Sequence, residues 1–238
     1  MFLYQSPKPD RKVKTIYGRP SQRRLDGAME HLSRGPVPIN PVVLNDIKRK
    51  LAQGKYQENR DLLLDDLKSD PGLYFYSASQ LTTLVQDHEN GVHPERHIKT
   101  LEYDQLTKLF SVTERDISPH RARNMNKVQA LRLQHCIASS QAAATLAAGM
   151  TAAGGDMSQD TASSAALFRQ LGLNLIAWNY PEQYSRALRA KKQGQGELET
   201  EIERLLGVSP LQVGAKLAAE WNIDPDVRRV LESDQKPQ

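Results

Sequence analysis

The sequence predicts an all-α protein: a single compact multi-helix bundle of HD-domain-like type with an extended N-terminal arm. Apolar residues recur at helical spacing through most of the 238 residues, and no stretch alternates as a half-buried strand would. Capping residues followed directly by proline, a strong helix-start signature, occur at Asp70-Pro71, Ser209-Pro210 and Asp224-Pro225. These observations indicate helices joined by short connections.

The chain divides into a basic arm, residues 1–35, and an all-helical domain, residues 36–238. The arm carries eight basic and three acidic residues, a surplus of five, so the formal net charge of +4 leaves the domain at −1. Its many prolines and glycines predict an extended, flexible segment. A basic arm suits contact with nucleic acid. A solvated tail is favoured, because aromatic residues among the basic ones are limited to Tyr4 and Tyr17.

Three helices are expected in the first half of the domain. The first follows Pro41 and stops at Gly54, and the second, with its apolar residues in 62–67, is capped by Asn59 or Asp61. The third starts at Asp70-Pro71 and runs to about residue 85. Two short helices joined in this way form a compact helical corner.

Residues 87–100 contain three of the six histidines. On a helix, His93 and His97 would share one face, where both could bind a metal. No third ligand is fixed by spacing, although Asp87 and His88 are candidates. An exposed polar loop is therefore the favoured interpretation, with a metal site as the alternative.

The second half of the domain is expected to contain longer helices. One runs from about residue 124 to 150, and its later part is rich in small residues that permit close helix packing. A connection over 151–159 leads to a core helix over 165–178, whose apolar residues recur at helical spacing. The remaining helices are expected over residues 101–110, 182–192, 198–206, 210–221 and 227–231, with Gly207 as a C-cap.

Composition also narrows the class of protein. No apolar run approaches the roughly 20 residues that cross a bilayer, and the N-terminus turns polar after Tyr4, which leaves no room for a signal-peptide core. The single cysteine, Cys136, excludes an internal disulfide and is expected to be a small buried hydrophobe rather than a reactive thiol. We therefore expect a cytoplasmic protein with no membrane contact.

Four stretches, in order, resemble the HD-related output domain (HDOD) family, an all-helical branch of the HD phosphohydrolase superfamily found mostly in bacterial signalling proteins. The resemblance covers roughly residues 36–231, and its stretches are PVPINPVVL, DDLKSDPGLYFYSASQ, LRLQHCIASSQAAATLA and LLGVSPLQVGAKLAAEWNID. It implies a domain that links a signal to a response.

The same resemblance implies positions for a catalytic metal, and most of them hold residues that are poor metal ligands. His135 matches the histidine of the helix before the HD pair, whereas Arg169 stands at the second histidine, Gln170 at the paired aspartate and Pro210 at a further histidine of many relatives. One imidazole cannot hold a catalytic metal, which needs about three protein ligands. A hydrogen-bonded residue in or beside the core is the simpler role for His135.

These residues predict a non-catalytic regulatory module that acts through contacts with a protein partner and needs no cofactor. Two alternatives remain open. An arginine in an emptied metal pocket can bind a phosphate or carboxylate, so Arg169 is a candidate site for a nucleotide-like anion, although a structural salt bridge is its simpler role. The second alternative is nucleic-acid binding through the arm.

Overall fold

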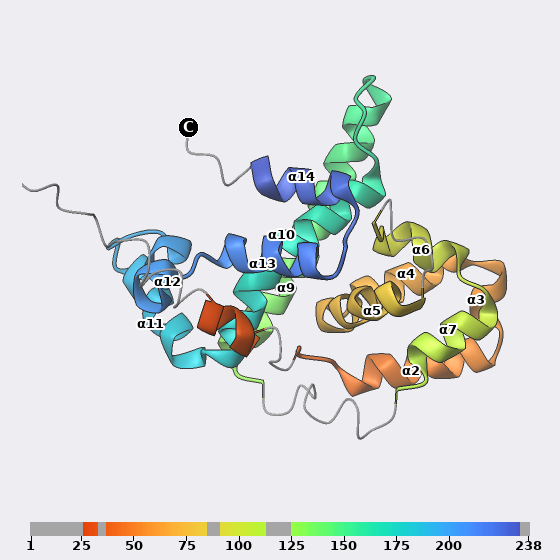
Figure 1. Ribbon diagram of the computed structural model, residues 1–238, viewed down its shortest axis with the longest axis horizontal. Coiled ribbons are helices and arrows are strands. Elements are labelled where there is room, and N and C mark those ends of the chain that lie inside the picture. The colour runs from red at the N-terminus through yellow and green to blue at the C-terminus, as the bar shows by residue number, and fades with distance from the viewer. Residues whose placement is uncertain (1–25, 33–36, 85–90, 113–124, 234–238) are drawn as a thin grey trace, which may run out of the picture.

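A computed structural model describes residues 26–32, 37–84, 91–112 and 125–233. Over these ranges every regular element is a helix, and isolated bridge residues such as Val92 and Ile223 form no strand, so the all-α prediction is confirmed. One group of helices comes from residues 37–112 and a second from residues 125–233 (Figure 1). None of the described helices is long and apolar enough to span a membrane.

Side chains that cap the backbone define the helices of the first group. Asn40 accepts from the N–H of Val42, and Asn59 accepts from that of Leu62, so Asn59 rather than Asp61 is the cap of the second predicted helix. The helices of this group are α2 (Pro41–Ala52), α3 (Lys55–Glu58), α4 (Arg60–Lys68), α5 (Pro71–Leu84), α6 (Pro94–Thr100) and α7 (Tyr103–Phe110).

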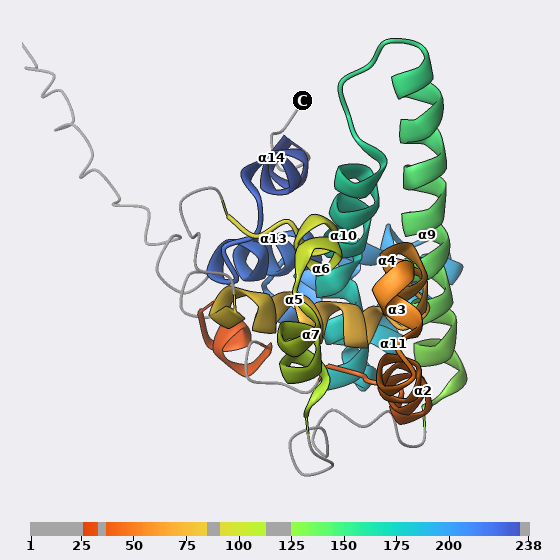
Figure 2. The ribbon, with the colours of Figure 1, turned by 90° about the vertical axis from the view of Figure 1, so that its right-hand side faces the viewer.

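In the second group, the longest helix begins with a capping box in which Asn126 and Gln129 each bind the other's backbone N–H. Gly207 adopts the left-handed conformation predicted for a C-cap. The helices are α9 (Lys127–Ala152), α10 (Gln159–Asn179), α11 (Pro181–Lys192), α12 (Leu198–Leu206), α13 (Pro210–Glu220) and α14 (Pro225–Ser233). The end of α9 and the turn into α10 extend beyond the other described helices (Figure 2).

Helix α10 is the centre of the bundle, as the apolar pattern of residues 165–178 predicts. It packs against α9, α13 and α14 within its own group, and against α6 of the first group. Phe168 lies 5.7 Å from Phe75 of α5 and 6.1 Å from Trp221, measured between ring centroids, so aromatic packing joins the two groups.

The crossing of α10 and α13 depends on a glycine. A Cβ atom added to Gly172 would lie 1.9 Å from the carbonyl oxygen of Pro210, far inside van der Waals contact. The backbones of the two helices therefore touch at this point, which fixes their separation.

Part of the segment assigned to the basic arm is ordered helix. Residues 26–32 are helical, and Met29 and Leu32 are buried in the core. Asp26 also lies 3.8 Å from the ammonium group of Lys216. The rest of the predicted arm, 1–25 and 33–35, lies outside the described residues, so its proposed flexibility and nucleic-acid contact stay predictions.

The interpretation of residues 87–100 as an exposed polar loop is wrong for the described part, residues 91–100. Pro94–Thr100 is a helix, and His93 and Glu95 are buried. The pattern misled because the buried polar groups of this segment bind partners far away in the sequence. Val92 also joins the second group: its N–H donates to Asn222 at 2.6 Å, and its carbonyl accepts from Asp224 at 2.9 Å.

Candidate functional site on three faces of α10

The face of α10 that meets α9 carries polar side chains bound to an arginine. Arg132 of α9 is only 8% exposed, and its guanidinium donates to Gln170 and, over 3.2 Å, to the amide oxygen of Asn174. One turn further along α9 the thiol of Cys136 is buried, which raises its pKa to about 11. This contact therefore contains a buried cation and an unreactive thiol.

The four residues of the implied metal site have different surroundings. Gln170 contacts Arg132, one turn before His135, whereas His135 itself is exposed on α9. Arg169 is exposed and lines a groove on another side of α10, and Pro210 is buried against Gly172. The assignment of these residues to superfamily ligand positions stays a prediction.

That groove lies between α9, α10 and α14, with a cavity volume of about 240 Å³. Small residues on α10 make its floor, because Ala162, Ala165 and Ala166 leave space that longer side chains would fill. Large apolar side chains stand on its walls: Leu146 is 68% exposed, Met150 58% and Met157 37%. Arg169 is the one charged side chain among the described residues that line it.

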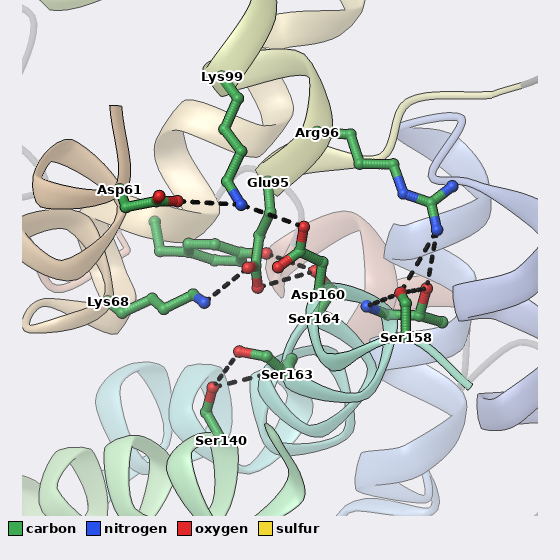
Figure 3. Close-up of polar contacts among 12 residues, drawn as sticks. Asp61, Lys68, Glu95, Arg96, Lys99, Ser140, Ser158, Asp160, Ser163 and Ser164 are labelled. Atoms are coloured by element: carbon green, nitrogen blue, oxygen red, sulfur yellow. Dashed lines mark hydrogen bonds and ion pairs between the residues drawn. The ribbon is translucent and has the colours of Figure 1, made fainter. Parts of the chain in front are cut away.

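A network of charged and hydroxyl side chains surrounds the N-terminal part of α10 (Figure 3). Glu95 of α6 has no exposed surface, and its carboxylate lies 2.6 Å from the ammonium group of Lys68 on α4. It also accepts from the Ser164 hydroxyl over 3.3 Å, which in turn lies 2.9 Å from the Tyr74 hydroxyl on α5. This network therefore connects four helices of the two groups.

The network divides its carboxyl groups into one that is easily protonated and one that stays charged. Burial raises the pKa of Glu95 to about 7, against the opposing effect of Lys68. Asp160 is also partly buried, but Lys99 at 3.3 Å holds the pKa of Asp160 below its usual value. Lys99 lies 3.0 Å from Asp61 as well, so one ammonium group connects α6 to both α4 and α10.

The two histidines considered as metal ligands have structural contacts. His93 caps α6, and burial lowers its pKa to about 4, so the ring is neutral near pH 7. The backbone N–H of His93 donates to Nδ1 of His97 over 3.0 Å, which uses one of the ring nitrogens that a metal would need. Within the described ranges, no group of three or more histidine, cysteine, aspartate or glutamate residues is placed to hold a metal ion.

Some of these residues could not be found by spacing. Lys68 lies 27 residues before Glu95 in the sequence, and Ser164 lies 69 residues after it. Each of the three resembles an ordinary surface residue on its own. Arg132 lies three residues before the expected His135 and is equally inconspicuous. A useful signal would have been the apolar context of Glu95, between the buried Val92 and Ile98.

Taken together, the helices define an all-helical domain with an arginine in the contact between α9 and α10. The HDOD domain family model matches residues 117–237, about half of the chain, and the chain belongs to this family. The match does not reach the two earlier stretches that resemble the family, PVPINPVVL and DDLKSDPGLYFYSASQ. No curated protein and no solved structure matched the chain.

Proposed function

We propose that this chain is a non-catalytic regulatory module that acts in signal transduction by binding a protein partner. The observation that carries the proposal is the Arg132 guanidinium, held between α9 and α10 by Gln170 and Asn174. A permanent cation beside the position of the family's paired aspartate repels a metal ion, and amide oxygens are weak ligands for one. The donor groups therefore disfavour the metal-assisted hydrolysis of the superfamily.

A surface suited to protein contact supports the second part of the proposal. The groove of α9, α10 and α14 exposes Leu146, Met150 and Met157 side by side with an apolar floor. Contiguous exposed apolar surface is typical of interaction sites, whereas single exposed apolar residues are common on any protein.

The test measures bound metal by elemental analysis and phosphatase and phosphodiesterase activity with added manganese, on the full chain. We expect neither metal at a molar equivalent nor turnover, and Arg132→Met, which removes the cation, serves as the comparison. Stoichiometric metal together with turnover in the wild-type protein would overturn the proposal.

Binding of a nucleotide-like anion is the second candidate, because Arg169 is exposed and lines the groove. A nucleotide would place its phosphates beside the Arg169 guanidinium and its base against alanine and methionine side chains. A thermal-shift panel of nucleotides checks this: stabilisation that Arg169→Ala removes would favour this candidate over protein binding.

A further inference from the structure

The apolar groove of α9, α10 and α14 has the dimensions of a helix-binding site. Its α9 wall extends from Ala143 to Met150, seven residues or about 10 Å along the helix axis. A bound helix that uses positions i, i+3 or i+4, and i+7 covers the same length with three side chains. The alanines of α10 leave room for such side chains on the floor.

The rim of the groove favours an occupant that is wide as well as apolar. Leu146 and Met150 stand one turn apart on α9 and project into solvent, so they are covered only by something that lies over the groove and its edge. A fatty acid chain is narrower than a helix and would cover less of the rim. Methionine adapts its shape to different apolar surfaces, which suits Met150 and Met157 to a protein contact.

Charge completes the description of the occupant. Arg169 is the charged side chain among the described residues that line the groove, and the groove continues past Met157 and Val230 into a cavity of about 290 Å³. The acids of that cavity are balanced by Arg96 and Arg229, and the positive end of the α10 dipole lies beside it. The Arg169 guanidinium has five N–H donors, so it can bind a carboxylate of the occupant in addition to the contact it already makes.

We propose that this groove binds an amphipathic helix of a partner protein, with apolar side chains at i, i+3 or i+4, and i+7 and an acidic side chain that contacts Arg169. The inference rests on the proposed function, because it names the kind of partner through which the module would act.

The test uses three fluorescein-labelled helical peptides with leucines at i, i+3 and i+7. Each peptide carries one glutamate, and the glutamate stands at a different one of three successive positions in each. Fluorescence anisotropy measures their binding to the full chain. We expect Leu146→Glu to weaken the best peptide at least about tenfold, because it places a charge in an apolar contact. Leu131→Glu is the matched control, since Leu131 lies on the same helix, is 47% exposed and does not line the groove.

A charge exchange tests the ion pair. Arg169→Glu should weaken the glutamate peptide about tenfold, and a peptide with lysine at that position should recover the loss. No binding by any of the three peptides, or equal effects of Leu146→Glu and Leu131→Glu, would overturn the proposal.

Two further results would assign the groove to another occupant and equally overturn it: dodecanoate that binds where the peptides do not, or self-association of the wild-type chain that Leu146→Glu abolishes. The metal and turnover measurements on the same samples address the proposed function separately. Turnover together with selective peptide binding would rule out the non-catalytic function and support the groove as a helix-binding site. No turnover together with no peptide binding would leave the non-catalytic function standing and rule out the helix-binding groove.

Discussion

Replacing the buried Glu95 by glutamine should change how the stability of the protein depends on pH. Glu95 has no exposed surface, and burial raises its pKa from 4.5 to about 7. The folded state therefore holds the proton more tightly than the unfolded state between these values. The stabilisation from Glu95 is complete below about pH 4.5 and is lost as the pH rises through about 7.

The magnitude follows from the size of the pKa change. Each pKa unit is worth about 1.4 kcal/mol, so the full effect is about 3 kcal/mol, of which about 2 to 3 kcal/mol falls between about pH 5 and about pH 8. Because the glutamine side chain does not titrate, Glu95→Gln should gain stability relative to the wild type by that amount over this range. Other titrating groups, such as Asp70, are present in both proteins and cancel in the comparison.

Urea unfolding followed by far-UV circular dichroism, at several pH values in this range, provides the measurement. Glu58→Gln, which removes an exposed carboxylate of α3, controls for the loss of one charge. If the free energies of unfolding of the wild type and Glu95→Gln change in parallel with pH, Glu95 does not titrate as the network requires, and the reasoning fails.

Two further predictions concern packing and capping. Gly172→Ala should destabilise the protein by about 2–3 kcal/mol because the added Cβ would meet the Pro210 carbonyl. Gly149→Ala, at an exposed position of α9 with open space around the added Cβ, should stabilise the protein by about 0.5–1 kcal/mol. Urea midpoints check the pair, and similar values for both variants would contradict the close crossing. Asp70→Ala should cost about 1–3 kcal/mol because the N–H groups of Asn40 and Gly72 lose their acceptor, and the exposed Asp65→Ala is the control. Thermal unfolding measures this difference, and equal melting temperatures would show that the Asp70 contacts add nothing.

Local rules account for the parts of the fold that were predicted correctly. Proline after a capping residue marks the starts of α5, α13 and α14, and the glycine at 207 ends α12, because these residues fix backbone conformations independently of the rest of the chain. The apolar spacing of residues 165–178 identifies the most buried helix for the same reason.

The rest depends on contacts between distant segments. Helix α6 looks polar in sequence because Glu95 and Lys99 belong to charged contacts with α4 and α10. The direction in which Arg169 and Gln170 point is set by the packing of α10, which sends these adjacent residues to different neighbours. Sequence resemblance aligns Arg169 and Gln170 with a metal site but contains no information about the direction in which each side chain points.

The short bridge at Val92 bears on where this protein can be divided. Its hydrogen bonds to Asn222 and Asp224 join a segment outside the matched family region to one inside it. Closing so long a loop costs conformational entropy, which these contacts help to offset. A fragment cut at the start of the HDOD match would expose Phe168 on its Phe75 side and leave Ile223 without its bridge partner. We therefore expect the folding unit to be larger than the family segment, so that a transplanted module needs residues 37–112 with it.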